Sequence, residues 1–397
     1  MSIQYTIYFK KYITFKLLLS LSIPFLFILI TSCSQDDSKF DDKPKLTIAE
    51  SMSADDSLFK KAIEKREFKF PEDHASHEEY KLEWWYFTGN LKAENGQEFS
   101  YQFTIFRNAL KPDSNYLTSN FSANQLYFYH FAVTDISNNK FYFYNDFARG
   151  AGGLAGANYS PLKVFVNNSY IIGEYGADSS LPIFTINAKA DQFELKLKLR
   201  PQKGIVLQGD DGLSQKSFDK NNNSYYYSIT RIESEGQLSF FEGENKKHFK
   251  VKGQSWLDRE WSTSALSKEQ VGWDWFSIQL SDTTEIMYFK LRNRDGSPNF
   301  AKGSLIYKDG SKRKLLMPEV FLEEKDYWTN DLGKKYPSKW ILSIPEENIK
   351  LNIETRVPDQ ELKLNIRYYE GSIKIKGFNG KHEVNGLGYV EMTGYSD

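Results

Sequence analysis

Residues 98–107, EFSYQFTIFR, alternate large apolar and small polar side chains with a period of two. In an extended chain the apolar set would lie on one face and the polar set on the other. The same alternation recurs in FELKLKLR (193–200) and in ELKLNI (361–366). These segments predict strands that bury one face and expose the other.

Asn-Gly or Asp-Gly pairs punctuate such segments, at 95–96, 211–212, 295–296, 309–310 and 379–380. These pairs tolerate the positive φ of tight hairpins. Aromatic residues, which favour strands, make up 16% of the chain. Because no helical pattern alternates with the strands, we predict an all-β protein of antiparallel sheets closed into barrels or sandwiches.

Charge and length narrow the class of protein. The chain has 51 basic and 52 acidic residues, so it lacks the basic footprint of a general nucleic-acid binder. Its 397 residues allow two domains. A polar break at 242–247 suggests a division near 250, which gives β domains over 70–250 and 251–397.

The first 32 residues read as an export leader. Lys10, Lys11 and Lys16 precede the apolar run 17–30, and the tetrapeptide ITSC ends at Cys33. One interpretation is a cleaved signal peptide with a stray Cys. We favour a bacterial lipoprotein acylated at Cys33, because the single thiol falls at the cleavage site. It would be anchored in the cell envelope, with Ser34 favouring the outer membrane.

The segment 33–69 would then be a polar tether. Its one helical signal is Ser53–Arg66, where an N-cap Ser and early acids precede late bases. We expect a short helix there, outside the core.

Two Trp-rich segments, WLDREW (256–261) and GWDWF (272–276), carry candidate acids. On a strand, Trp256, Asp258 and Glu260 would share one face. Asp274 would share its face with apolar side chains, where burial raises the pKa of a carboxyl group and suits it to donate protons. The competing interpretation is that Arg259 pairs with Glu260 or Asp274 as a buried ion pair.

The histidines give a weaker signal. His130 alternates with apolar residues, which is more typical of a core histidine than of a ligand. His74 and His77 precede Glu83, and two His with a carboxylate can bind zinc, but no firm helix sets their spacing. We therefore expect no metal. The aromatic residues near the acids predict a cavity for an apolar ligand, or barrel core, or both within one barrel.

Beyond these separate signals, a series of segments resembles the carotenoid 1,2-hydratase (hydroxyneurosporene synthase) family, also called AttH-like. The matching segments run in order along the chain: HEEYKLEWWYFTGNL (77–91), YQFTIFR (101–107), YFYHFAVTD (127–135), LAGA (154–157), LQGDDGLSQK (207–216), YYYS (225–228), GQSWLDREWSTS (253–264), GWDWFSIQL (272–280), YPSKW (336–340), YEGSIKIKG (369–377) and GLGYVEMTGY (386–395). The resemblance implies two lipocalin-like β-barrels with a ligand between the domains. It also implies cofactor-free addition of water to a C=C bond of an isoprenoid-like chain.

From this resemblance Asp258 is the leading proton donor, with Glu260 or Asp274 as its partner. Trp256, Trp273, Tyr227, His130 and Trp85 would line the substrate pocket. Aromatic faces would stabilise the cation that forms, and the second carboxylate, or a His, would take a proton from the attacking water. The alternative is a non-catalytic carrier of lipid or isoprenoid in the cell envelope. A hydrolase ranks lowest, because spacing reveals no nucleophile–His arrangement.

Overall fold

The computed structural model describes residues 58–111, 122–177, 179–243, 245–264, 266–297 and 299–396. The predicted leader, Cys33 and most of the predicted tether lie outside the described residues. No helix within the described residues is long and apolar enough to cross a membrane.

The predicted helix at Ser53–Arg66 is wrong over its described part, 58–66, which is irregular. Tertiary contacts hold this segment instead. The Lys60 amide donates to the Glu79 carbonyl (3.0 Å), and the Tyr225 hydroxyl donates to the Glu64 carbonyl (2.8 Å). A 3-10 turn, η2 (Glu72–His74), follows.

Thirteen strands of the described chain form the first sheet, all pairing antiparallel. They are β1 (Leu82–Ala93), β2 (Glu98–Ala109), β3 (Gln125–Asp135), β4 (Lys140–Arg149), β5 (Ala155–Asn158), β6 (Leu162–Val166), β7 (Ser169–Glu174), β8 (Ile183–Lys189), β9 (Phe193–Pro201), β10 (Val206–Leu207), β11 (Leu213–Gln215), β12 (Asn223–Glu242) and β13 (Asn245–Ser262). The order is β4-β3-β2-β1-β13-β12-β9-β8-β7-β6-β5, and β10 and β11 pair with β12.

Ten further strands of the described chain form the second sheet. They are β14 (Gln270–Leu280), β15 (Glu285–Asn293), β16 (Phe300–Ile306), β17 (Lys312–Leu316), β18 (Phe321–Thr329), β19 (Lys335–Ile344), β20 (Ile349–Thr355), β21 (Glu361–Lys363), β22 (Arg367–Asn379) and β23 (His382–Thr393), with the 3-10 turns η3 (Met317–Glu319) and η4 (Pro345–Glu347). The order is β17-β16-β15-β14-β23-β22-β20-β19-β18, and β21 pairs with β22.

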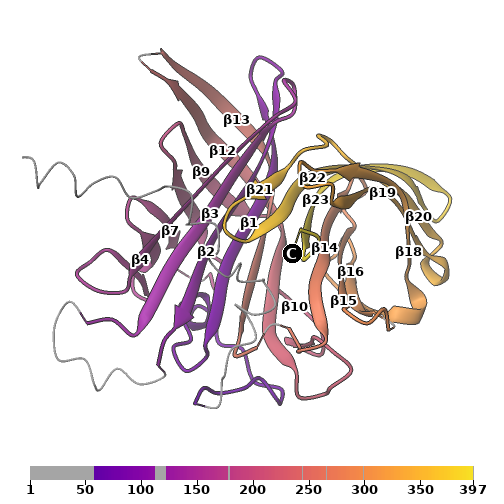
Figure 1. The fold of residues 1–397 in the computed structure, drawn as a ribbon, viewed down its shortest axis with the longest axis horizontal. Helices are drawn as coiled ribbons and strands as arrows, with labels where there is room; N and C mark the ends of the chain where they lie inside the picture. Colours follow the sequence, from indigo (N-terminus) through magenta and orange to yellow (C-terminus); the bar gives the residue numbers. More distant parts are fainter. Residues whose placement is uncertain are drawn as a thin grey trace, which may run out of the picture. The chain divides into compact units, whose positions relative to one another are not determined.

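Both sheets curl (Figure 1), and each encloses an apolar cluster. In the first, β3 and β4 contact β6 across the barrel, and the interior is filled by side chains such as Phe87, Phe103 and Leu197. In the second, Phe276, Trp340 and Leu351 belong to the interior cluster. The predicted fold class, all-β with two lipocalin-like antiparallel barrels, is therefore confirmed.

The division between the sheets lies between Ser262 and Gln270 rather than at 250. Strand β13 pairs with β1 from Val251 to Ser262 and with β12 on its other side. A cut at 250 would sever this central strand. The segment WLDREW therefore belongs to the first sheet, whereas GWDWF begins the second.

A third apolar cluster lies where the two sheets pack against each other. It joins Tyr86 and Trp256 of the first sheet to Trp275 and Tyr389 of the second. Polar contacts reinforce this interface, since the Asn90 amide donates to the Gly388 carbonyl at 3.2 Å. The candidate site lies within this layer.

Candidate active site between the sheets

A pocket opens between the outer faces of the two sheets and is named here the acid pocket. The first sheet lines it with Trp84, Tyr86, Phe106, Lys216, Tyr226, Asp258 and Glu260, and the second with Trp273, Trp275, Phe289, Leu291 and Glu391. Its water-accessible volume is about 80 Å³, several times the ~10–15 Å³ that one water requires. It suits a slim section of an apolar ligand. Of the alternatives that the sequence left open, the pocket lies between the sheets, and apolar core clusters occupy the two barrel interiors.

Strand register brings these side chains together. Trp84 pairs with Glu260, and Tyr86 pairs with Asp258, across β1 and β13. Directly opposed residues of antiparallel strands point to the same face. The next strand continues the row, because Tyr226 of β12 also pairs with Glu260. Alternation along three neighbouring strands thus builds one wall of acids and aromatic rings.

Asp258 is a buried carboxyl group held by three neutral donors. The Tyr226 hydroxyl donates to Oδ2 at 2.5 Å, and Ser228 (2.5 Å) and Trp256 Nε1 (2.7 Å) donate to Oδ1. Burial raises the pKa of Asp258 to about 7, although these hydrogen bonds oppose the rise. The group can therefore carry a proton near neutral pH.

Glu260 faces the same pocket in a different electrostatic environment. Lys216 Nζ lies 2.6 Å from its Oε1, and both side chains are largely buried. The same ammonium lies over the rings of Tyr226 and Phe289, at 4.9 and 4.7 Å from their centroids. Two neighbouring acids thus have different partners, because neutral donors hold Asp258 whereas an ammonium group lies beside Glu260.

Glu391 contributes a carboxyl group from the opposite wall, and it is not among the residues predicted from the sequence. Its Oε2 accepts a hydrogen bond from Trp273 Nε1 at 2.9 Å. Burial raises its pKa to about 7, and the nearby Asp258 and Glu260 add to the rise. The signal that could have found it is one acid among apolar and small residues in GLGYVEMTGY.

Glu370 lies beside Glu391 on the neighbouring strand, β22. The Tyr86 hydroxyl donates to its Oε2 at 2.8 Å. Burial raises the pKa of Glu370 well above its usual range, and Glu391 adds to this effect. The interface therefore collects carboxyl groups that favour the neutral form.

The predicted site residues divide between this pocket and other places. Asp258, Glu260 and Trp273 line the acid pocket. Trp256 donates a hydrogen bond to Asp258 and packs edge-on against Trp275, with ring centroids 6.3 Å apart. These residues are brought together as the alternation in WLDREW predicts.

Tyr227, Trp85 and His130 do not line the pocket. Tyr227 and Trp85 point to the opposite face of their strands, and their neighbours Tyr226 and Trp84 take the pocket positions. His130 lies behind Phe106, with ring centroids 5.2 Å apart, and its Nδ1 is 2.5 Å from the Tyr368 hydroxyl. Burial lowers the pKa of His130 to about 4, so its ring is neutral near neutral pH.

Asp274 also lies outside the pocket, on the interior face of β14. It shares this face with Phe276, as the sequence predicts, but charged groups surround it there. Lys290 Nζ lies 3.0 Å from Oδ2, Arg292 Nε lies 3.3 Å from Oδ1, and the Tyr395 hydroxyl donates to Oδ1 at 2.9 Å. The expectation of an acid on an apolar face beside the substrate is wrong. The site is a buried ion-pair cluster.

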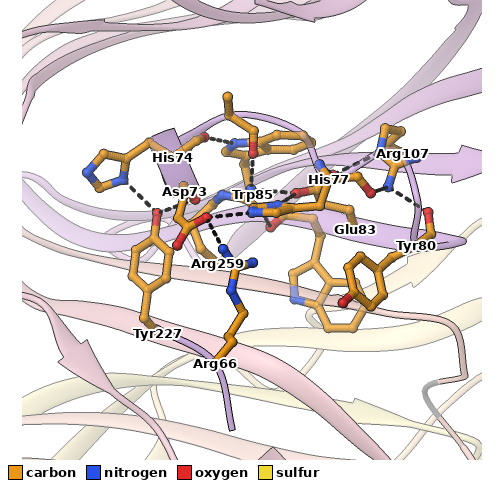
Figure 2. A network of polar contacts seen from close by, with 12 residues as sticks. Arg66, Asp73, His74, His77, Tyr80, Glu83, Trp85, Arg107, Tyr227 and Arg259 are labelled. Carbon is orange, nitrogen blue, oxygen red and sulfur yellow. Dashed lines mark hydrogen bonds and ion pairs between the residues drawn. The ribbon is translucent and has the colours of Figure 1, made fainter. Parts of the chain in front are cut away.

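Arg259 pairs with neither Glu260 nor Asp274, but with Glu83 on the other face of the sheet (Figure 2). Its guanidinium nitrogen lies 2.6 Å from Glu83 Oε1, and Arg107 Nε lies 2.8 Å from Oε2. Burial opposes ionisation of Glu83, but the two arginines outweigh it and hold its pKa well below its usual range. Arg259 also lies over the Trp85 ring, 4.0 Å from the centroid.

His77 and His74 have separate partners in the same region (Figure 2). His77 Nδ1 lies 2.8 Å from Glu83 Oε1, and Nε2 lies 3.0 Å from Asp73 Oδ1. Both ring nitrogens of His77 therefore lie within hydrogen-bond distance of a carboxylate oxygen. His74 donates from Nε2 to the Ser180 carbonyl and accepts from the Tyr227 hydroxyl at Nδ1. Burial lowers the pKa of His74 to about 4.

The strands β1 and β13 therefore serve two networks. Glu83 and Arg259 fix the segment before β1 to the first sheet, whereas Trp84 and Glu260, one position further along each strand, face the acid pocket. A family model described as AttH-like matches residues 61–395, which include both networks and both sheets.

The chain belongs to the AttH-like family. Among curated proteins, it resembles a kievitone hydratase from Fusarium solani subsp. phaseoli, with 22% identity over 174 residues, 43% of this chain and 49% of that protein. The chain thus matches about half the length of this curated relative.

Solved structures show the AttH-like fold over most of this chain. The crystal structure of an AttH from Nitrosomonas europaea superposes with a TM-score of 0.74 at 28% identity, covering 85% of this chain and all of the other. Kievitone hydratase from Nectria haematococca gives a TM-score of 0.64 at 17% identity, covering 85% of this chain and 98% of the other. The latter likeness concerns the fold alone.

Proposed function

We propose that this AttH-like protein is a hydratase-like enzyme that protonates a C=C bond of an apolar, isoprenoid-like substrate and adds water to the resulting cation. The acid pocket supports this most directly. In it a carboxyl group whose pKa is raised to about 7 by burial lies two residues from a carboxylate paired with a lysine, among aromatic rings. The kievitone hydratase match supports the same kind of reaction.

Asp258 is the proton donor in this mechanism. Its proton passes to the less substituted alkene carbon, and the π electrons form the new C–H bond. A tertiary carbocation remains, and the faces of Trp275, Trp84 and Tyr226 stabilise it by cation–π attraction. The pocket already holds the Lys216 ammonium against two such faces, which supports its suitability for positive charge.

Glu260 is the base. Water attacks the cation, and Glu260 takes a proton from it as the C–O bond forms. The substrate has then gained H and OH, Asp258 is ionised and Glu260 is protonated. Return of one proton from Glu260 to Asp258 restores the enzyme. Glu391 faces them from the second sheet, and burial raises its pKa to about 7.

Incubation with prenylated phenols and isoprenoid alkenes in H₂¹⁸O, followed by mass spectrometry, tests this proposal. We expect a product that carries one ¹⁸O, and loss of about 10²–10⁴-fold in turnover for Asp258→Asn with ligand binding retained. The matched control is Asp309→Asn, because Asp309 is exposed in the turn between β16 and β17. Full turnover by Asp258→Asn would contradict the assignment. Binding without turnover by the native chain would favour the carrier function.

We also propose that Cys33 carries the lipid anchor and that the protein lies at the bacterial cell envelope, facing the periplasm. The ITSC tetrapeptide after an apolar run supports this. Multiple acyl chains would give stable membrane attachment, whereas one chain gives marginal binding. Cys33→Ala should move the protein from the membrane fraction to the soluble fraction. Full retention in the membrane fraction would contradict the anchor.

A further inference from the structure

One cross-strand row of the second sheet runs from carboxyl groups to an ammonium group along the face that packs on the first sheet. Glu370 pairs with Glu391, Glu391 with Trp275, Trp275 with Phe289, and Phe289 with Lys302. Because directly opposed residues share a face, these five side chains form one line. Adjacent strands lie about 4.8 Å apart, so three spacings place Lys302 about 14 Å from Glu391.

Lys302 lies in a second cavity, named here the lysine groove and lined in part by Asp210, Gln215, Lys220, Lys302 and Lys314. Its water-accessible volume is about 330 Å³. Phe289 lines both the lysine groove and the acid pocket. A ligand could therefore extend from one cavity into the other past this ring.

The lysine groove carries an excess of positive charge. Lys302 Nζ donates to the neutral Gln215 side chain at 2.7 Å, and the neighbouring Lys312 donates to the Leu207 and Gly209 carbonyls. Among the described residues, these partners are neutral oxygens rather than carboxylates. Burial lowers the pKa of both lysines, as expected for ammonium groups without full compensation.

The carboxylate in the lysine groove is already engaged. Lys65 and Lys314 both form ion pairs with Asp210. Its charge is therefore shared between two cations, and Lys302 and Lys220 add further positive charge to the same walls. Such a groove attracts an anion that can reach several ammonium groups at once.

We propose that the lysine groove binds the anionic head group of an amphipathic substrate whose apolar chain passes Phe289 into the acid pocket. The head is a carboxylate or a phosphate, since both suit ammonium donors. This inference rests on the proposed function for the identity of the reactive end, and the cross-strand row places the head group about 14 Å from Glu391, which lines the acid pocket. The substrate is then a long-chain acid or phosphate ester rather than a neutral hydrocarbon.

Three probes with the same chain test the head group: 12-bromododecanoate, 12-bromododecyl phosphate and 12-bromododecanol. The bromine quenches nearby Trp fluorescence, so titration reports binding at the chain end beside Trp275. We expect one or both anions to bind at least about tenfold more tightly than the alcohol, and the stronger of the two identifies the head. Trp275→Phe should weaken the quenching for every probe.

Lys302→Gln should reduce the preference for the anion and leave alcohol binding unchanged. The matched control, Lys308→Gln, changes an exposed lysine in the turn between β16 and β17 and should keep the full preference. Equal binding of the anions and the alcohol by the native chain would overturn the proposal, as would an anion preference that is the same in Lys302→Gln as in the native chain. Hydration of a neutral alkene and its loss in Asp258→Asn would stand in either case, so the two proposals fail separately.

Discussion

Lys216 forms an ion pair with Glu260 at 2.6 Å, so the carboxylate two residues from Asp258 has a cation beside it, whereas Asp258 is held by neutral donors. In the proposed mechanism this difference makes Asp258 the proton donor and Glu260 the base. The raised pKa of Asp258 depends on burial, since an exposed aspartate ionises near ~3.9.

Asp258 should make the native protein less stable as the pH rises. Its pKa is raised to about 7 in the fold, above its usual ~3.9 in the unfolded chain, so the native state binds the proton more tightly. The contribution of Asp258 to stability is fully present below its unfolded pKa and is lost as the pH rises through its folded pKa. Asp258→Asn lacks this titration. Between about pH 5 and pH 8 the variant should gain about 2–3 kcal/mol relative to the native chain in urea unfolding. A constant difference would contradict the raised pKa.

Tyr226→Phe and Tyr227→Phe form a matched pair of neighbouring substitutions. Tyr226 donates to Asp258, whereas Tyr227 contacts His74 on the other face. Loss of a donor to the carboxylate disfavours the anion, so Tyr226→Phe should raise the pKa of Asp258 above its native value. Tyr227→Phe should leave it unchanged. Carboxyl titration by infrared difference spectroscopy checks both, and equal shifts in the two variants would contradict the strand register.

The Lys216–Glu260 pair should show strong coupling. Lys216→Met leaves a largely buried carboxylate without its cation, which costs about 3–5 kcal/mol. The double variant Lys216→Met with Glu260→Gln removes both charges and should be more stable than Lys216→Met alone. Thermal or urea unfolding of all four chains gives the coupling energy, which we expect to exceed about 1 kcal/mol. If the effects of the two substitutions on the free energy of unfolding were additive, Lys216 and Glu260 would not be coupled.

Glu83→Gln should destabilise the fold by about 3–5 kcal/mol. The substitution removes the negative charge that compensates Arg107 and Arg259 in a buried site. Glu94→Gln is the control, because Glu94 is exposed in the turn after β1, and its effect should stay below about 0.5 kcal/mol. Similar small effects at both positions would show that the network in Figure 2 contributes little to stability.

Local alternation of apolar and polar residues in the sequence predicts much of this architecture. The period-two patterns and the Gly-containing turns predict the antiparallel strands, and alternation in WLDREW places Asp258 and Glu260 on one face. The resemblance in ordered motifs leads to the family and to the fold of two barrels. These inferences depend on neighbours within a strand, which a sequence displays directly.

Other features depend on which element packs against each face of a strand. Local sequence patterns do not predict that packing. Asp274 shares a face with Phe276 as predicted, but that face is a barrel interior where Lys290 and Arg292 reach it. The pocket predictions for Tyr227 and Trp85 are wrong by one position along the chain. A shift of one position moves a side chain to the other face of a strand. Glu391 is distant in sequence from Asp258, and pairing of β23 with β14 brings it to the pocket.

The protonation state of Asp258 is the most direct test of the central claim. Selective ¹³C labelling of aspartate side-chain carboxyls, with Asp258→Asn to assign the signal, allows its titration by NMR without a substrate. We predict a midpoint near pH 7, in line with the pKa of about 7 that burial gives Asp258. A midpoint near ~3.9, the ordinary value for an exposed aspartate, would contradict the claim that this pocket holds a neutral acid.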